Sequence, residues 1–368
     1  MHKVLDRNET VHIGCHDGPF HADEVFAVAA LNCIFHDVDV LRTRDPDLLF
    51  ACDMRVDVGN DYNHYALSYD HHMSWFEVRH KTPPPKQLPN GKSHDFQRGP
   101  LRAGFGLIWL HYGTEIVTKV IKSHFRPEIL ECFKDMDFVH IQQQIDNSLV
   151  AQIDTLDNGE GEEFLLTQSP YRCNDLSRMV SNFNPSVIEQ QNFEHMAPEV
   201  VKSVTLERFM AAVSFAKNII IKEICSQAEM VYFREKFMKL LADKDPKNPV
   251  LVLDKYFHWH QAYGRAGDQT SGTEMIVFPG ATGWMCQSPR YYFRRDKNVY
   301  SPTLKDGSRR TLKHQAPPEV CGLTDQALEE ATGVKGATFI HKGGHLGAAK
   351  TLESAIELAH FFIDKGRQ

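Results

Sequence analysis

Residues 11–24 read Val-His-Ile-Gly-Cys-His-Asp-Gly-Pro-Phe-His-Ala-Asp-Glu, and this stretch decides the fold. Val11, Ile13 and Cys15 alternate with other residues, which indicates a short strand. From Glu24 to Phe35, Ala, Val, Leu and Phe recur at helical spacing, which indicates a buried helix. The stretch therefore predicts a strand, a loop and a helix in succession.

Strand-like patterns continue beyond this unit. Val38 and Val40 make one apolar pair, and Met54, Val56 and Val58 make a further apolar set. Strands separated by helical segments are typical of a parallel sheet in an α/β protein. We therefore expect an α/β fold whose N-terminal domain is built on a parallel sheet.

The loop between the first strand and its helix carries His16, His21 and Asp23. In an open parallel sheet such a loop lies at the carboxyl edge, where ligands bind. We expect His21 and Asp23 to point into one site at the start of the helix. For Asp23 taken alone, a helix cap is the favoured alternative, because the N-terminus of a helix stabilises a carboxylate.

Asp57 lies between two apolar residues of the third predicted strand. A carboxylate buried in a strand is strongly unfavourable unless it is paired or bound to a metal. A metal ion is the simplest partner, and hydrogen bonds from loop amides are the alternative.

Asp70, His71 and His72 follow one another in the sequence. Imidazole and carboxylate together suit Mn²⁺, Co²⁺ or Zn²⁺, whereas all-oxygen sites favour Mg²⁺ or Ca²⁺. Because neighbouring side chains of an extended chain point to opposite sides, one histidine can bind a metal while the other faces a substrate. A pair of surface histidines without function is the alternative.

Asp154 and Asp157 end a predicted helical stretch and lie three residues apart, on one helix face. The C-terminus of a helix disfavours carboxylates, so this pair indicates a compensating cation. A solvated acidic turn is the alternative, because Glu160, Glu162 and Glu163 follow.

The chain has 368 residues, of which 42% are hydrophobic and 24% charged, and this length and composition predict a globular protein of two domains. Its net charge is −7, so contact with nucleic acid requires a local basic patch or bound cations.

The eight cysteines include no Cys-x-x-Cys pair, which predicts reduced thiols and a cytoplasmic or nuclear location, with mitochondria as an alternative. We expect neither a signal peptide nor a membrane span.

The middle of the chain has helical periodicity, through Ile129–Leu149 and from about Ser186 to Leu241. Asp243–Pro249 is the clearest linker, because it combines two prolines with charged and polar residues. Beyond it, strand-like runs and a last helix from about Ser354 to Phe362 predict a smaller α/β domain.

Arg290–Lys297 alternates cations with aromatic residues and contains Arg294 and Arg295. Such a segment can bind single-stranded nucleic acid through its phosphates and by base stacking. A solvated edge strand with aromatic residues facing the core is an equal alternative.

His341–Thr351 is a glycine-rich segment with cationic donors. Gly343 and Gly344 let backbone amides approach a phosphate, and His345 and Lys350 add charged donors. A glycine-rich turn before a helix is the alternative.

These motifs occur in the order and approximate spacing of one known pattern. The chain resembles the DHH phosphoesterase superfamily and, within it, the Myg family (melanocyte-proliferating-gene type) of exonucleases. The likeness covers most of the chain, in residues 16–24, 42–46, 56–59, 69–72, 106–113, 154–159, 182–185 and 339–351.

The resemblance implies a phosphoesterase with two divalent ions and a bridging hydroxide. The implied ligands are His16, His21 and Asp57 for one ion, and Asp23, Asp57, His71 and Asp157 for the other. Mn²⁺ is expected, with Mg²⁺ or Co²⁺ as alternatives. His72 would face the scissile phosphate, and Asp70 would orient a ligating histidine.

The resemblance also implies a domain plan and a reaction. Residues 1–190 would form the catalytic domain, 191–248 a helical connector, and 249–368 a substrate-binding domain that includes Gly343, Gly344, His345, Lys350, Arg294 and Arg295. We expect a 3′-5′ exonuclease on single-stranded RNA, with DNA as an alternative substrate. A homodimer is one candidate assembly of the chain. A phosphatase of pyrophosphate or a dinucleotide, or a non-catalytic RNA-binding protein, are the competing interpretations.

Overall fold

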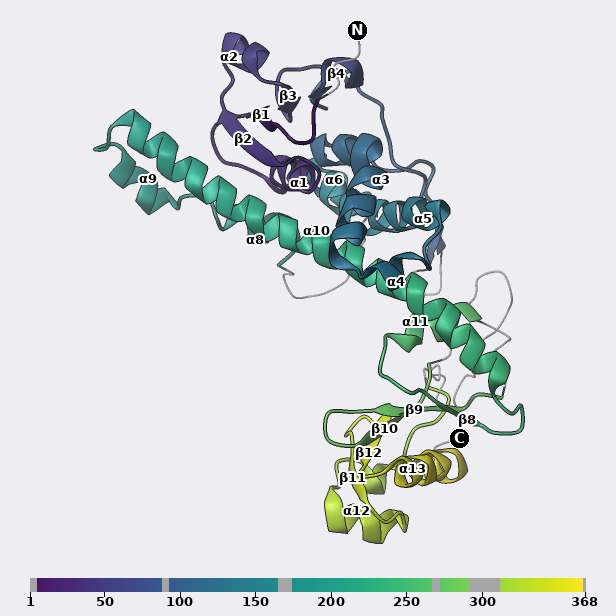
Figure 1. Cartoon of the computed structure of the whole chain (residues 1–368). Helices are drawn as coiled ribbons and strands as arrows, with labels where there is room; N and C mark the ends of the chain where they lie inside the picture. The colour runs from purple at the N-terminus through teal and green to yellow at the C-terminus, as the bar shows by residue number, and fades with distance from the viewer. Residues whose placement is uncertain (1–4, 88–92, 165–173, 267–271, 291–311, 367–368) are drawn as a thin grey trace. The chain divides into compact units, whose positions relative to one another are not determined.

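The computed structural model describes residues 5–87, 93–164, 174–266, 272–290 and 312–366 (Figure 1). The chain divides into two compact units, residues 1–228 (unit 1) and residues 229–368 (unit 2). The boundary falls inside the long helix α10 (Pro198–Asp243). The domain boundaries expected near residues 190 and 248 stay a prediction.

A five-stranded sheet organises unit 1 (Figure 1). The strand order is β2-β1-β3-β5-β4, in which the first four strands run parallel and β4 is antiparallel to β5. The strands are β1 (Thr10–Cys15), β2 (Asp37–Arg42), β3 (Met54–Val56), β4 (Tyr62–Asn63) and β5 (Ser68–Tyr69). The expectation of an α/β fold with a parallel N-terminal sheet is confirmed.

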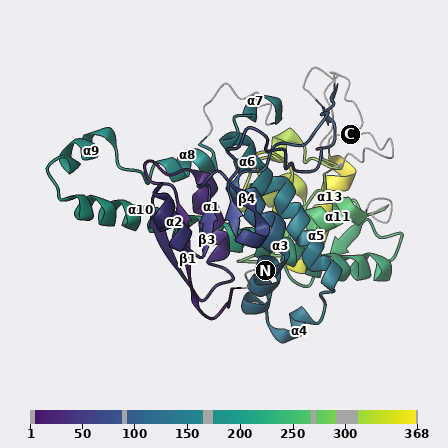
Figure 2. The same ribbon diagram turned by 90° about the horizontal axis from the view of Figure 1, so that it is seen from above.

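Three helices pack against one another beside this sheet (Figures 1 and 2). They are α1 (Ala22–Leu31), α3 (Gly104–His124) and α6 (Ala151–Asp157). Every residue of α1 is buried, as expected of a helix that lies in a core. Two of those buried residues, Asp23 and Glu24, are acidic, and both lie in the first turn next to the carboxyl end of β1.

Shorter elements complete unit 1. They are α2 (Pro46–Ala51), a 3₁₀ turn η1 (His64–Ala66), β6 (Lys86–Gln87), β7 (Ser93–His94), α4 (Pro127–Leu130), α5 (Asp135–Ile145), a π-helical turn η2 (Asp146–Val150), α7 (Gly161–Phe164), α8 (Leu176–Ser181) and α9 (Val187–Phe193).

The helical span expected from about residue 186 to 241 is two helices, α9 and α10. The break precedes Pro198, because proline lacks an N–H and disfavours helical geometry in the residue before it. α9 lies beside the first part of α10 (Figures 1 and 2), where Arg208 Nη2 bonds Glu189 Oε1 at 2.6 Å. Although α10 is 46 residues long, no helix within the described ranges has the length and apolar composition to cross a bilayer.

Unit 2 contains a second five-stranded sheet, of order β11-β12-β10-β9-β8. Its neighbours are antiparallel except for the parallel pair of β8 and β9. The elements are β8 (Val250–Val252), α11 (Trp259–Ala266), β9 (Met275–Pro279), β10 (Trp284–Gln287), a 3₁₀ turn η4 (Pro318–Val320), α12 (Asp325–Thr332), β11 (Ala337–Ile340), β12 (Leu346–Ala349) and α13 (Leu352–Lys365). Buried Leu358 and Phe362 of α13 pack on the sheet residues Val277 and Cys286. The smaller C-terminal α/β unit is therefore confirmed.

Candidate active site

His16 follows β1 directly and is 5% exposed. Its Nδ1 lies 2.8 Å from the backbone oxygen of Asp17 and donates to it. Nε2 therefore faces Oε1 of Glu24 at 2.9 Å and Oδ2 of Asp57 at 3.5 Å. Burial lowers the pKa of His16, but hydrogen bonds with Asp57 and Glu24 outweigh it and raise the pKa to about 10. The ring is fixed so that Nε2 points at carboxylates.

His21 and Glu24 lie beside His16 at the start of α1. The His21 ring is exposed, and its centroid is 5.4 Å from that of the His16 ring. The backbone N–H of His21 donates to Oε1 of Glu24 at 2.9 Å. Glu24 is completely buried. Glu24 therefore belongs to this group of candidate ligands, although Asp23 was the only carboxylate of this turn that was predicted to bind a metal.

Asp57 follows β3 instead of lying within it, which corrects the expectation of an acid inside a strand. Its φ is +56°, a left-handed conformation that is uncommon outside glycine, so the extended strand ends at Val56. The carboxylate is buried between His16 and His71, and Oδ1 lies 3.4 Å from Nε2 of His71. Burial raises the pKa of Asp57, but the nearby imidazoles of His16 and His71 outweigh it and hold the pKa well below its ordinary value.

His71 brings the two halves of the cluster together. Its Nε2 lies 3.2 Å from Oδ2 of Asp157 and 4.0 Å from Oδ2 of Asp23. Its Nδ1 donates to Oδ1 of Asn158 at 3.1 Å, which leaves Nε2 facing the carboxylates. Burial lowers the pKa of His71, but the nearby carboxylates of Asp157 and Asp57 outweigh it and raise the pKa to about 11.

Asp70 orients His72, whereas Asn158 orients His71. Oδ1 of Asp70 lies 2.7 Å from Nδ1 of His72, and Oδ2 accepts the backbone N–H of Asn60 at 2.6 Å. The hydrogen bond that His72 donates to Asp70 raises the pKa of His72 above its ordinary value, although partial burial opposes it. The His72 side chain is 57% exposed, so its ring can reach a bound molecule.

Asp23 is fully buried and caps a helix other than its own. Its two carboxylate oxygens accept the backbone N–H groups of Gly104 at 2.7 Å and Phe105 at 2.6 Å, where α3 begins. The capping role that was the alternative for Asp23 therefore exists, although the capped helix is α3. Burial, followed by the nearby Asp157 and Asp57, raises the pKa of Asp23, and a cation would oppose that effect.

The two acids of α6 have different partners. Asp157 faces His71, whereas Asp154 is buried and its Oδ2 lies 2.6 Å from Nε2 of His80. The expectation that one cation compensates both acids is therefore corrected, because a buried histidine pairs with Asp154. His80 in turn contacts Asp146, which accepts two hydrogen bonds from the guanidinium of Arg102.

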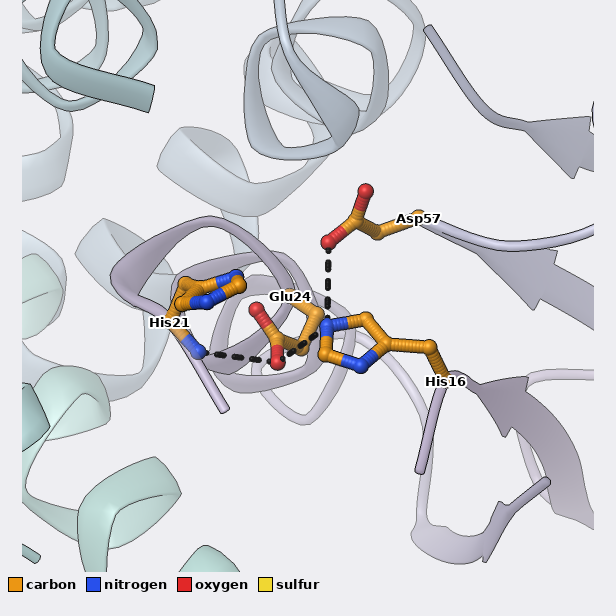
Figure 3. Close-up of side chains that lie close together, drawn as sticks. All are labelled: His16, His21, Glu24 and Asp57. Carbon is orange, nitrogen blue, oxygen red and sulfur yellow. Dashed lines mark hydrogen bonds and ion pairs between the residues drawn. The ribbon is translucent and has the colours of Figure 1, made fainter. Parts of the chain in front are cut away.

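The structure gathers the predicted ligands into three overlapping groups. In each group one atom per residue lies within 4.8 Å of the others, and the groups are His16, His21, Glu24 and Asp57 (Figure 3), then Asp57, His71 and His72, then Asp23, His71 and Asp157. Within the described ranges, Glu24 Oε2, Asp57 Oδ1 and His71 Nε2 are buried without a hydrogen-bond partner. Because buried anionic oxygens are stabilised by cations, these residues fit divalent metal ions.

A cavity of about 800 Å³ opens over this cluster. His16, His21, Asp57, His72 and Asp157 line it on one side. Its other lining residues include Arg44, Arg55 and Phe50, whose ring is 85% exposed. The candidate metal ligands, two guanidinium groups and an exposed aromatic ring thus share one cavity.

Sequence reasoning missed Asn158, Phe50 and Arg55. Asn158 directly follows the predicted Asp157, but its hydrogen bond to His71 joins residues 87 positions apart. Phe50 lies in α2 and Arg55 in β3, and no pattern in the sequence indicates that they share a cavity with Asp57. A search for polar residues near the ends of parallel strands would have included Arg55, whereas Asn158 follows helix α6 and Phe50 lies in helix α2.

The predicted substrate residues of the second half lie in unit 2 or outside the described residues. His345 precedes β12, and its ring centroid lies 4.5 Å from that of His341. Gly343 and Gly344 form the turn between these histidines, and Lys350 follows β12 as an exposed side chain. Arg294 and Arg295 belong to residues 291–311, which lie outside the described ranges.

Comparisons with known proteins extend over nearly the whole chain. A family model, MYG1_exonuc, described as an uncharacterised protein family (UPF0160), matches residues 12–363. The MYG1 exonuclease of Bos taurus is 26% identical over 360 residues, which cover 94% of this chain and 83% of the relative. A MYG1 protein of Schizosaccharomyces pombe is 26% identical over 366 residues, which cover 97% of this chain and 98% of the relative.

Among solved structures, RecJ from Thermus thermophilus in complex with Mn²⁺ is 15% identical. That match covers 95% of this chain and 52% of the RecJ chain, with a TM-score of 0.20.

Proposed function

We propose that this chain, which belongs to the MYG1 exonuclease family (UPF0160), is a metal-dependent 3′-5′ exonuclease that acts on single-stranded RNA. The relatives named above support hydrolysis of a nucleic acid. Direction of cleavage and preference for RNA are the parts of the proposal that go beyond their names.

One observation carries the proposal: carboxylates and imidazoles from four separate segments meet at one cavity, and three of their buried atoms have no hydrogen-bond partner among the described residues. His16, His21 and Asp57 would hold one divalent ion, and Asp23, Asp57, His71 and Asp157 a second. Mn²⁺ suits this mixture of nitrogen and oxygen donors. When bound, such a pair of ions supplies Lewis acidity that stabilises the charge developing on a phosphoester during hydrolysis.

His72 is suited to deliver a proton to the leaving oxygen. Its exposed ring lines the cavity, and Asp70 fixes Nδ1 at 2.7 Å, which leaves Nε2 to face a substrate. The carboxylate of Asp70 raises the pKa of His72, which favours the protonated imidazole that a proton donor requires.

The cavity wall supports a nucleotide as substrate. Arg44 and Arg55 present guanidinium groups that can bind phosphates, and Phe50 presents an aromatic face that can stack on a base. We assign a further contribution to phosphate binding to four residues of unit 2, which are Gly343, Gly344, His345 and Lys350. We assign binding of the same substrate to Arg294 and Arg295, because cations alternate with aromatic residues in their segment of the sequence.

Single-stranded RNA labelled at either end, incubated with the purified chain and Mn²⁺, tests this proposal. A ladder that shortens progressively from the 3′ end is expected, with slower loss of a matched DNA strand. Asp57→Asn should abolish cleavage without unfolding the protein, because it removes the charge shared by both ion sites. Asp39→Asn is the control, since Asp39 is an exposed carboxylate of β2 that pairs with His12, outside the cluster.

Other results would replace the proposal. Cleavage of pyrophosphate or of a dinucleotide, with intact RNA, would assign a small-molecule phosphatase. Binding of RNA without any cleavage in Mn²⁺ would assign a non-catalytic RNA-binding protein.

A further inference from the structure

Glu24 has a buried oxygen that the fold itself does not use. Its side chain is 0% exposed, and Oε1 accepts the backbone N–H of His21 at 2.9 Å and faces Nε2 of His16 at the same distance. These contacts account for Oε1. Oε2 is buried and has no hydrogen-bond partner among the described residues.

Glu24 lies beside three side chains that are proposed to bind the first ion. Figure 3 shows His16, His21, Glu24 and Asp57 around one space, each contributed from the carboxyl edge of the sheet or the first turn of α1. One ligand atom of each lies within 4.8 Å of the others. A single cation can therefore contact all four side chains at once.

Helix capping is the simpler role for Glu24, since it occupies the third position of α1 and bonds the backbone N–H of His21. Capping uses one oxygen and works at an exposed helix end. The cap and the contact with His16 account for Oε1. They leave Oε2 buried without a partner, and a buried anionic oxygen without a partner is strongly unfavourable.

We propose that Glu24 is a direct ligand of the first ion, through Oε2, so that this site consists of two imidazoles and two carboxylates. The inference rests on the proposed metal binding and adds a ligand that the sequence comparison did not assign. With Glu24, the two sites together hold four carboxylates, whose charge matches that of two divalent ions.

Isothermal titration with Mn²⁺ compares the parent chain with Glu24→Gln. Glutamine keeps an oxygen that can accept the His21 N–H, and it loses the charge. Loss of a residue that only supports a ligand lowers metal affinity by about 10- to 100-fold, so a direct ligand should lower the affinity of one ion by more than about 100-fold and leave the other ion bound. Glu189→Gln is the matched control, because Glu189 is the capping glutamate at the third position of α9, outside the cluster.

A crystal structure of the parent chain with Mn²⁺ provides a measurement that needs no variant. Anomalous scattering should place an ion about 2.2 Å from Oε2 of Glu24, as for other carboxylate ligands. An ion that is bound by His16 and Asp57 but lies beyond bonding distance of Glu24 overturns this inference alone, as does a Glu24→Gln variant that binds Mn²⁺ like the parent. A parent chain that binds no Mn²⁺ overturns the proposed function itself.

Discussion

Asp57 adopts a left-handed backbone conformation that places its carboxylate between two imidazoles. Such a conformation costs about 1–3 kcal/mol outside glycine, and it persists only where the surroundings impose it. Here the backbone N–H of Asp57 is held by the carbonyl of Tyr69 at 3.0 Å, and the side chain is held by His16 and His71. The strain is located at the residue that the proposed mechanism needs most.

Phe50 should contribute to substrate binding and not to stability, because its ring is 85% exposed on the cavity wall. We expect Phe50→Ala to raise KM for single-stranded RNA by about 5- to 100-fold, which is the range of one lost base-stacking contact. Hydrolysis of bis(p-nitrophenyl) phosphate, which has no base, should be unchanged.

The same kinetics on Tyr65→Ala provide the control, because Tyr65 is another exposed aromatic residue and is not among those that line the cavity. Equal losses in both variants, or a loss on the base-free substrate, would contradict the role given to Phe50.

Asn158 should set the ring orientation of His71. Asn158→Ala removes the acceptor of the Nδ1–H, and we expect Mn²⁺ affinity to fall by about 10- to 100-fold, as for other residues that orient a ligand. Titration with Mn²⁺ measures this loss. Asn158→Asp retains an acceptor oxygen and should retain most of the affinity, while Asn192→Ala on α9 should have no effect. An Asn158→Ala variant with parental affinity would show that His71 needs no orienting partner.

At the scale of elements, one acid links two helices to the sheet. Asp23 lies in the first turn of α1 and caps α3 through two backbone N–H groups. Its Oδ2 lies 4.0 Å from Nε2 of His71, which follows β5. Gly104 is required at this junction, because a Cβ there would lie 2.7 Å from Oδ2 of Asp23. The ends of these elements are therefore positioned by the same carboxylate that is proposed to bind an ion.

Arg102 should be critical for the packing of α3 against the π-helical turn η2. Its guanidinium bonds both oxygens of buried Asp146, at 2.9 and 3.0 Å. Arg102→Met leaves that carboxylate without its main counter-charge, and we expect the free energy of unfolding to fall by about 3–5 kcal/mol, measured by urea denaturation.

The exposed pair of Arg208 and Glu189 offers the comparison. Arg208→Met should cost less than about 1 kcal/mol, because ion pairs in water contribute little. The double variant Arg102→Met with Asp146→Leu should recover part of the loss. A loss for Arg102→Met no larger than that for Arg208→Met would rule out a structural role for the buried pair.

At the scale of the whole molecule, all the proposed ion ligands belong to unit 1. Mn²⁺ at about 100 times its Kd should therefore stabilise unit 1 by about 2.7 kcal/mol, which corresponds to roughly 5–10 °C in its Tm. Scanning calorimetry with Mn²⁺ and then with excess EDTA measures the shift and its reversal. Asp57→Asn should abolish it, and a shift confined to the transition of unit 2 would place the ions elsewhere.

The sequence alone was sufficient for the order of elements and for most of the ligand types. Alternating apolar residues before His16 and helical spacing after Glu24 predict the first strand and helix, because burial on one side imposes those two periods locally. The predicted acids and histidines follow β1, β3 and β5 or end α6, and the structure brings these four ends together. Their role as ligands stays a proposal.

Only the tertiary structure decided which residue partners which. Asp154 pairs with His80 across 74 positions, Asn158 with His71 across 87, and Asp23 caps a helix 81 positions away. Local sequence records which residues are apolar or ionisable, but distances across such separations depend on how the helices pack on the sheet. For the same reason the backbone turn at Asp57 and the unpaired oxygen of Glu24 are properties of the folded chain, since each results from contacts that no local pattern contains.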